Sequence, residues 1–364
     1  MKRRIKKLIK MSVKGPILFI VKRAIALYLI VVLSVYITIV IANLGGYVDR
    51  ITQAQILEDI TFTIKRDPQY RGLPPEEVDR IIRDTYELEL KKLGLDTPFI
   101  VRSFRYLVNG LTLDLGRALY LTSDTGSRQV KLIILERLPQ TVMLFTTASV
   151  LNFFIHLFLG LYLSRHYGGK LDKLFIALSP TSIVPGWLYG LFLIMIFASI
   201  LRVLPYGGYV DVPPPDDPVS YGLSVLKHMI LPLSSWIISG FFMGVYGSRT
   251  FYLIFSTEDY VTVAKAKGLP PRIIERRYIL RPALPPVITS FSLGLIGSWG
   301  GAIITETVFN WPGLGKVMRD AINSMDTPVI VGEVIIYAYL LAITVLLLDI
   351  LYLFIDPRIR ARFR

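Results

Sequence analysis

The sequence predicts an all-α polytopic membrane protein. Hydrophobic residues make up 53% of the 364-residue chain, and its mean hydropathy is +0.53. Several apolar runs reach about 20 residues, the length that a helix needs to cross roughly 30 Å of hydrocarbon. The chain has no cysteine, which excludes a disulfide scaffold and a cysteine metal site within it.

Six transmembrane helices are predicted, at 24–44, 139–164, 175–201, 229–250, 286–310 and 333–355. Lysine and arginine indicate their orientation, because cytoplasmic segments carry an excess of these residues. The segments expected inside hold 23 of them against five acids; they are 1–23, 165–173, 249–281 and 356–364. The segment 45–138 is balanced, with 14 basic and 14 acidic residues. We therefore expect both termini in the cytoplasm of a cell-membrane protein. The net charge of +14 then reflects the flanks of the spans and not a nucleic-acid partner.

The first apolar run has two interpretations, a signal anchor that is retained and a signal peptide that is cleaved. The run from Ala24 to Leu44 is longer than the apolar region of a signal peptide, and Ile41-Ala-Asn43 is a poor cleavage site, so we favour the anchor. The chain then divides into a basic cytoplasmic N-terminus 1–23, a first transmembrane helix 24–44, an extracytoplasmic region 45–136, a transmembrane domain 137–355 with a cytoplasmic loop at 251–285, and a basic cytoplasmic tail 356–364.

The extracytoplasmic region contains at least one amphipathic helix. Leu73-Pro-Pro-Glu-Glu77 is a helix start, and apolar residues recur at helical spacing as far as Gly94; they are Val78, Ile81, Ile82 and Leu88. The proline at 98 breaks this helix, and a second apolar stretch at 99–115 either lies on the membrane or packs on the first. The region is either a solvated cap over the spans or a landing surface for an external partner.

The polar loop 251–285 between the fourth and fifth spans, here called the polar island, is typical of two short helices. Ser256 is placed to cap the first helix, and Gly268 supplies the permissive backbone that ends it. A proline pair opens the second, which we expect to run through Arg277. Ala264 and Ala266 beside Gly268 leave a low surface that another protein can approach closely.

The spans carry little chemistry. Among the acids in or near the hydrocarbon we single out Glu306 and Asp349, and each either has a role in transport or anchors a span end. Glycines four residues apart let helices approach closely; the pairs are Gly186 with Gly190, Gly240 with Gly244, and Gly297 with Gly301. Prolines are expected to bend the third and fourth spans; they are Pro180, Pro185 and Pro232. Such spans form either a movable bundle around a pathway or a static packed one.

Motifs of enzymes are absent from the sequence. Gly313-Leu-Gly-Lys316 lacks the earlier glycine and the following hydroxyl residue of a P-loop. The three histidines are too scattered for a metal site, and no nucleophile elbow occurs. We therefore expect no cofactor, no metal and no enzymatic activity in this chain.

Several segments together resemble the inner-membrane permeases of ABC importers, and most of all the first permease of the dipeptide/oligopeptide/nickel group. They are Leu93-Gly-Leu-Asp-Thr-Pro98, Asp114-Leu-Gly116, Glu136-Arg-Leu-Pro-Gln-Thr141, Leu204-Pro-Tyr-Gly-Gly-Tyr209, Asp259 to Gly268, Ala283-Leu-Pro-Pro286, Glu306-Thr-Val-Phe-Asn-Trp-Pro-Gly-Leu-Gly315 and Asp356-Pro-Arg358. The resemblance covers nearly the whole chain.

The resemblance implies a type I importer fold, in which the loop at 251–285 is the "EAA" coupling loop that docks on an ATPase subunit. The glutamate of the general motif is replaced by Thr262, as is common in this branch. The residues that match the coupling loop are Asp259, Tyr260, Ala264, Ala266, Gly268, Leu284 and Pro286. For the pathway or helix packing, the residues of the spans themselves suggest Gly240, Gly244, Gly297, Gly301, Glu306 and Asp349.

The same resemblance implies the partners. These are a second, homologous permease subunit, two P-loop ATPase subunits, an external solute-binding protein and the lipid bilayer. Peptides and oligosaccharides both remain open as substrates. The main alternative is a gradient-driven secondary transporter or channel, which predicts broken helices in paired halves and ionisable residues at mid-membrane.

Overall fold

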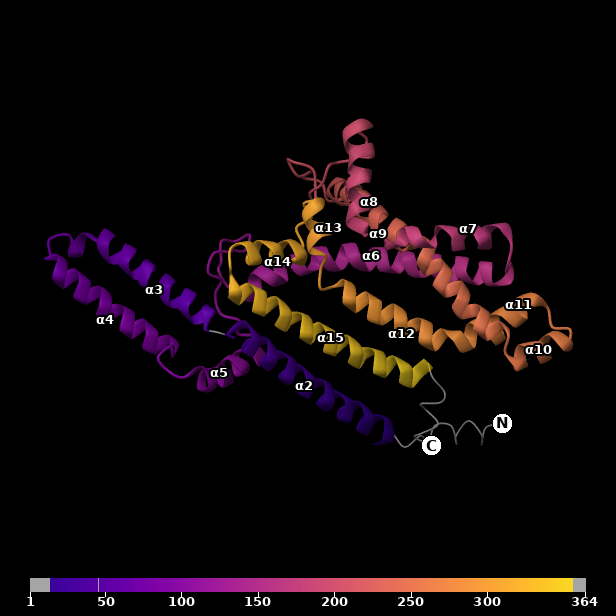
Figure 1. Cartoon of the computed structure of the whole chain (residues 1–364), viewed down its shortest axis with the longest axis horizontal. Coiled ribbons are helices and arrows are strands. Elements are labelled where there is room, and N and C mark those ends of the chain that lie inside the picture. Colours follow the sequence, from indigo (N-terminus) through magenta and orange to yellow (C-terminus); the bar gives the residue numbers. More distant parts are fainter. Residues whose placement is uncertain (1–13, 45, 356–364) are drawn as a thin grey trace. The chain divides into compact units, whose positions relative to one another are not determined.

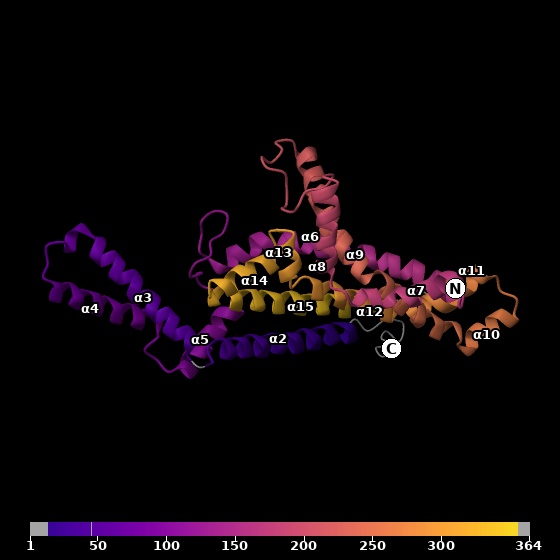
Figure 2. The same cartoon turned by 45° about the horizontal axis from the view of Figure 1, so that its top comes forward.

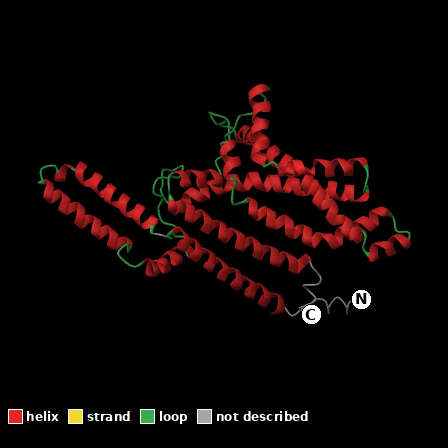
Figure 3. Ribbon diagram, viewed as in Figure 1, coloured by secondary structure: helices red, strands yellow, loops and turns green. Residues whose placement is uncertain are grey.

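The computed structural model describes residues 14–44 and 46–355, and its ribbon consists of helices and loops (Figure 3). The helices up to the middle of the chain are α2 Lys14–Ala42, α3 Tyr47–Arg66, α4 Pro75–Leu93, α5 Phe99–Leu111, α6 Val130–Arg165 and α7 Lys170–Leu178 (Figure 1). Those that follow are α8 Gly186–Leu193, α9 Pro218–Ser256, α10 Asp259–Ala266, α11 Pro271–Ile273, α12 Arg281–Ser298, α13 Ile303–Val308, α14 Leu314–Asn323 and α15 Thr327–Ile355. The basic segments 1–13 and 356–364, with the Asp356-Pro-Arg358 motif, lie outside the described residues.

Five helices in the described part of the chain are long and apolar enough to cross a membrane. They are Gly15–Ala42, Val130–Arg165, Pro218–Ser256, Pro271–Ser298 and Thr327–Leu353. A bent pair of shorter helices adds a sixth span if it is one broken span. The all-α polytopic fold is therefore confirmed. Each of the five helices begins before its predicted span, because a helix does not stop where the hydrocarbon does.

The predicted third span, 175–201, is not one straight helix. Lys170–Ile183 and Gly186–Ile200 meet at an angle of 93°. Pro185 lies at the break and directly precedes α8, and proline there cannot donate the backbone hydrogen bond that would continue the first helix. The bend expected at Pro185 is thus confirmed. Pro180 lies in the 3₁₀ turn Ser179–Ile183 just before this break, and Pro232 lies inside the long helix α9.

The predicted fifth span, 286–310, has the wrong ends. The helix begins at Pro271, passes through the π-helical turn Ile274–Leu280 and ends at Ser298. Gly301 then turns the chain with a φ of +77°, in the left-handed region that favours glycine. α13 follows as a separate short helix. The second helix of the polar island therefore does not end at Arg277 but continues into the span.

The chain forms two compact units. The first comprises 1–25, 134–323 and 340–364, and the second comprises 26–133 and 324–339. Within the first unit, α10 and α11 lie at the far ends of α9 and α12 (Figures 1 and 2). This places the polar island at one end of the helix bundle.

In the second unit, α3 and α4 pack as an antiparallel hairpin (Figures 1 and 2). α4 begins at Pro75 as predicted and ends at Gly94, whose φ is +70°. Its apolar stripe buries Ile82 against α3, a helix that the sequence analysis did not predict. Leu88 is not part of the stripe, because its side chain is 58% exposed.

Candidate functional site

The polar island is built around α10 and the turn at Gly268. The backbone N–H of Gly268 donates to the carbonyl of Lys265 at 2.9 Å, and that of Leu269 donates to Ala264 at 3.3 Å. This paired pattern is the Schellman motif, which requires a left-handed residue, and Gly268 has a φ of +69°. The prediction for Gly268 is therefore confirmed. Ser256 does not cap α10, because its hydroxyl donates to Leu253 within α9 at 2.8 Å.

A hydrophobic cluster, here called the loop core, fixes the island to three long helices. Its buried members come from α6, α9, α10, the π-helical turn and α12; they are Leu161, Tyr252, Val261, Ala264, Ile274, Ile279 and Ala283. Ala264 is only 2% exposed, so it packs inward and is not part of an open surface. The loop core makes α10 a rigid extension of the bundle.

The outward face of α10 carries other residues that the sequence analysis selected. Asp259, Tyr260, Ala266 and Gly268 are exposed, and the apolar Val263 between them is 52% exposed. Leu284 and Pro286 lie away from this face, in the first turns of α12, where Leu284 is half-buried and Pro286 is exposed. Exposed apolar atoms beside a tight turn are typical of a protein contact surface.

Two ion pairs tie the same end of the bundle together. Arg165, the last residue of α6, forms an ion pair of 2.7 Å with Glu275 in the π-helical turn. Arg249 of α9 donates two hydrogen bonds of 2.7 Å to the buried carboxylate of Asp172 in α7, which also accepts from the backbone of Gly168 at 2.8 Å. Because both partners of the second pair are buried and hydrogen-bonded, loss of either one leaves an uncompensated charge.

A cavity of about 750 Å³ lies in the first unit, between α6, α9 and α12. Its polar lining consists of hydroxyl, amide and imidazole groups; the residues are Ser149, Asn152, His156, Ser239, Ser248, Ser290 and Ser298. None of the residues that line it is Lys, Arg, Asp or Glu. Tyr252 lines this cavity and also belongs to the loop core. The helices that enclose the cavity are therefore the helices to which α10 is fixed.

The selected glycines have different roles in the structure. Gly240 and Gly297 line the cavity. At Gly244 a Cβ atom would lie 2.1 Å from the ring of His156, so this glycine permits the close approach of α6 and α9. Gly301 lies beyond the end of α12 and does not share a helix face with Gly297. A Cβ at Gly301 would lie 2.6 Å from the backbone nitrogen of Gly315.

Glu306 organises a cluster of the segments that carry the family resemblance. Its buried carboxyl accepts hydrogen bonds from the hydroxyl of Thr141 at 2.9 Å and the backbone of Lys316 at 3.0 Å. Thr141 in turn accepts from the backbone of Leu314 at 2.7 Å. Glu306 lies in α13, beyond the span that ends at Ser298, and burial raises the pKa of its carboxyl to about 7. These hydrogen bonds join α13 to α6 and to α14, so Glu306 has a structural role, and we call this cluster the clasp.

Neighbouring contacts extend this clasp. The indole of Trp311 donates to the carbonyl of Gln140 at 3.1 Å, and the backbone of Gly208 donates to the carbonyl of Phe309 at 2.8 Å. The segments 136–141, 204–209 and 306–315 therefore meet in one place. Asp349 lies elsewhere, in α15, where it forms an ion pair with Arg23 of α2.

Comparison with known proteins identifies the chain. The family model described as "Binding-protein-dependent transport system inner membrane component" matches residues 156–361. The chain belongs to this family. It is a multi-pass membrane protein and a permease of a binding-protein-dependent importer, and its relatives are transport permeases rather than enzymes.

Three relatives align with most of the permease. The probable D,D-dipeptide transport system permease protein DdpB of Escherichia coli (strain K12) is 32% identical over 285 residues, 74% of this chain and 82% of the relative. The oligopeptide transport system permease protein AppB of Bacillus subtilis (strain 168) is 30% identical over 278 residues, 74% and 83% of the two chains. The glutathione transport system permease protein GsiC of Salmonella paratyphi A (strain ATCC 9150 / SARB42) is 30% identical over 271 residues, 74% and 82%.

Sequence reasoning missed the residues that join the elements of the permease. Asp172 and Glu275 are two of the five acids in the strongly basic inside segments, and both form ion pairs, Asp172 with Arg249 inside α9 and Glu275 with Arg165 at the end of α6. An isolated acid in a strongly basic segment is a sequence signal for an ion pair, because its charge is opposite to that of the residues around it. Thr141 offered no comparable signal on its own.

Proposed function

We propose that this permease is the membrane subunit of an ATP-driven importer, which couples to ATPase subunits through the loop 251–285 around Gly268. The observation that carries the proposal is the connection between α10 and the cavity. The exposed face of α10 is fixed by the loop core to α6, α9 and α12, and these helices enclose the polar cavity. A push on α10 therefore reaches the cavity walls through packed side chains. Close-packed interiors transmit displacement with little compression.

In this proposal the cavity is one half of the translocation pathway. A second, homologous permease subunit supplies the other half, and two P-loop ATPase subunits each bind one α10. Closure of the ATPase pair on ATP moves both loops as rigid bodies and changes the access of the cavity from one side of the membrane to the other. An external solute-binding protein delivers the substrate. The positive-inside rule supports cytoplasmic termini and a cytoplasmic α10.

Peptides are the proposed substrate class, with oligosaccharides as the second candidate. The relatives are named for D,D-dipeptide, oligopeptide and glutathione transport. The hydroxyl, amide and imidazole groups of the cavity offer hydrogen bonds without a fixed ionic partner. Such a lining favours passage of polar solutes over tight retention, because no charged side chain among the lining residues holds an ionised solute.

Cross-linking of neighbouring positions on α10 tests this proposal. The native chain has no cysteine, so Val263→Cys and Ala264→Cys each introduce a single thiol. Val263 is 52% exposed and Ala264 is 2% exposed. With a bifunctional maleimide, Val263→Cys should cross-link to the co-expressed P-loop ATPase subunit, and the yield should change when ATP is added. Ala264→Cys is the matched control and should not react. Absence of any ATPase adduct from Val263→Cys in an assembled, active complex contradicts the proposal.

A further inference from the structure

α5 has two faces of opposite character. Arg102, Ser103 and Gly110 are buried. The apolar residues of the other face are strongly exposed, at 71% for Ile100, 63% for Val101, 59% for Phe104 and 58% for Val108. α5 is too short to span a bilayer. A short amphipathic helix with an unpartnered apolar face needs an apolar partner.

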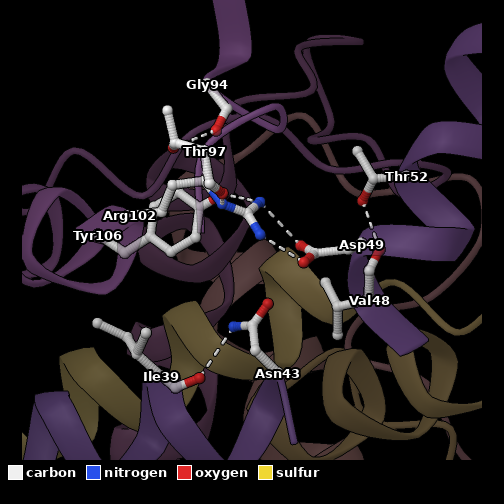
Figure 4. Close-up of polar contacts among 9 residues, drawn as sticks. All are labelled: Ile39, Asn43, Val48, Asp49, Thr52, Gly94, Thr97, Arg102 and Tyr106. Atoms are coloured by element: carbon white, nitrogen blue, oxygen red, sulfur yellow. Dashed lines mark hydrogen bonds and ion pairs between the residues drawn. The ribbon is translucent and has the colours of Figure 1, made fainter. Parts of the chain in front are cut away.

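The buried face of α5 is hydrogen-bonded to the first turn of α3, where the α3–α4 hairpin begins. The guanidinium of Arg102 donates to both carboxylate oxygens of Asp49 in the first turn of α3, at 3.0 and 2.5 Å (Figure 4). It also donates to the carbonyl of Thr97 at 3.0 Å (Figure 4). Arg102 is only 4% exposed. This paired and hydrogen-bonded group fixes α5 and α3 to one another.

Towards its C-terminal end, α5 packs against the membrane helix α2. A Cβ atom on Gly110 would lie 2.8 Å from Val35 of α2 and 3.2 Å from Ile335 of α15. The ring of Phe104 lies 5.9 Å from that of Tyr36. The exposed face of α5 therefore continues the exposed apolar surface of α2, where Leu33 is 58% exposed.

The position of Val35 along α2 gives the depth of this contact. Arg23 is the last charged residue before the uncharged run 24–44. Val35 lies about 18 Å further along the helix axis, at about 1.5 Å per residue. Because the hydrocarbon is roughly 30 Å thick, Val35 and the neighbouring Gly110 lie on the order of 10 Å inside it.

The C-terminal end of α5 has the hydrogen bonding that this depth requires. Its last four carbonyl groups would be orphans in an isolated helix, and hydrocarbon offers them no water. In the structure each has a partner. Val108 accepts from the backbone of Thr112 at 2.9 Å, Asn109 from Asp114 at 2.9 Å, and Gly110 from Leu113 at 3.3 Å. The carbonyl of Leu111 accepts from the hydroxyl of Tyr339 in α15 at 2.8 Å.

From these observations we infer that α5 from Phe104 to Leu111 dips into the leaflet at the C-terminal end of α2, with Phe104 and Val108 against lipid acyl chains. The helix is then an interfacial anchor. Its lipid-facing side fixes its depth, and Arg102 on its other side holds the hairpin above the membrane. This inference depends on the membrane-spanning character of α2 and not on the proposed ATPase coupling.

Spin-label accessibility tests the inference with a matched control. Single cysteines replace Phe104, Val108 and, on the hairpin, Leu88, whose side chain has the same 58% exposure as that of Val108. Each full-length variant is spin-labelled and reconstituted in phosphatidylcholine/phosphatidylglycerol vesicles. Collisions are then measured with oxygen, which concentrates in hydrocarbon, and with a water-soluble nickel chelate.

The labels at Phe104 and Val108 should collide several-fold more with oxygen than with the nickel chelate, and the label at Leu88 should show the reverse. A Val108 label that matches Leu88 overturns the inference, because the face then lies in water. A label that is immobilised and shielded from both reagents also overturns it, because another protein chain then covers the face. Circular dichroism of each variant confirms that the helices are retained.

Discussion

Arg165 and Glu275 form a 2.7 Å ion pair that joins the end of α6 to the π-helical turn behind α10. Their side chains are 41% and 16% exposed, so the pair contributes only about 0–1 kcal/mol to stability. Its proposed importance is mechanical, because it links the loop to a wall of the cavity. Arg165→Glu should therefore reduce transport per ATP hydrolysed while leaving the complex assembled.

The charge swap separates this coupling from a general surface effect. Arg165→Glu with Glu275→Arg restores an ion pair and should recover most of the ratio of uptake to hydrolysis in proteoliposomes. If the double variant has the same ratio of uptake to hydrolysis as Arg165→Glu alone, the ion pair does not transmit motion from the loop to the cavity wall.

Glu306 should act as a structural clasp. Glu306→Ala leaves the part-buried N–H of Lys316 and the hydroxyl proton of Thr141 without their acceptor and opens a cavity. It should cost on the order of 2–3 kcal/mol of stability, since bonds to ionisable groups are strong and buried donors are costly to leave unpaired. Glu306→Gln retains the shape and should be milder, because its amide can donate to Thr141 while its carbonyl accepts from Lys316. Thermal unfolding in detergent measures both, with Glu87→Ala on α4 as an exposed control. Equal midpoints for the Ala variant and the wild type contradict the clasp.

Single cysteines test the orientation of the permease. Lys91→Cys and Asp216→Cys should react with an impermeant maleimide added outside intact cells, whereas Lys170→Cys and Lys265→Cys should react only after permeabilisation. All four side chains are exposed, so failure to react reports the side of the membrane and not burial. Labelling of Lys265→Cys in intact cells places α10 outside and overturns the proposed coupling.

The features that could be predicted from the sequence are those that depend on one residue or one short segment alone. The apolar runs predict the spans, and Gly268 predicts its turn, because hydrophobicity and a left-handed φ are properties of the segment itself. Pro185 predicts the break before α8 for the same reason. The proline-initiated helix α4 likewise needs no long-range information.

What could not be predicted depends on contacts between distant segments. Ala264 reads as an open surface, but packing against Leu161 and Tyr252 buries it. The helix α3 has no clear apolar stripe and is held by α4 and by Arg102. The fifth span ends at Ser298, and beyond it Gly301 passes close to the backbone of Gly315, a contact that apolar composition does not reveal.

The exposed side of α4 tests whether the hairpin receives an external binding protein. Asp84 and Glu87 are exposed acids on this helix. If they form part of a docking surface, Asp84→Lys with Glu87→Lys should raise the binding-protein concentration that half-saturates stimulated ATP hydrolysis in proteoliposomes, and basal hydrolysis should be unchanged. Arg80→Glu with Arg83→Glu is the control for charge change of the opposite sign. An unaltered half-saturation for both variants leaves the hairpin as a structural cap.

The central claim is that α10 couples the permease to ATP hydrolysis, and it depends most directly on Gly268. No atom beyond Gly268 itself and its two chain neighbours lies within 4 Å of a Cβ built at this position, but its φ of +69° disfavours a side chain. Valine there costs about 1–2 kcal/mol and should displace the exposed face of α10, whereas asparagine tolerates this conformation. The decisive measurement is binding-protein-stimulated ATP hydrolysis by the reconstituted complex. Gly268→Asn should retain most of it and Gly268→Val should lose it, with both variants inserted in the membrane. Normal complex yield and normal stimulated hydrolysis in Gly268→Val would contradict the account.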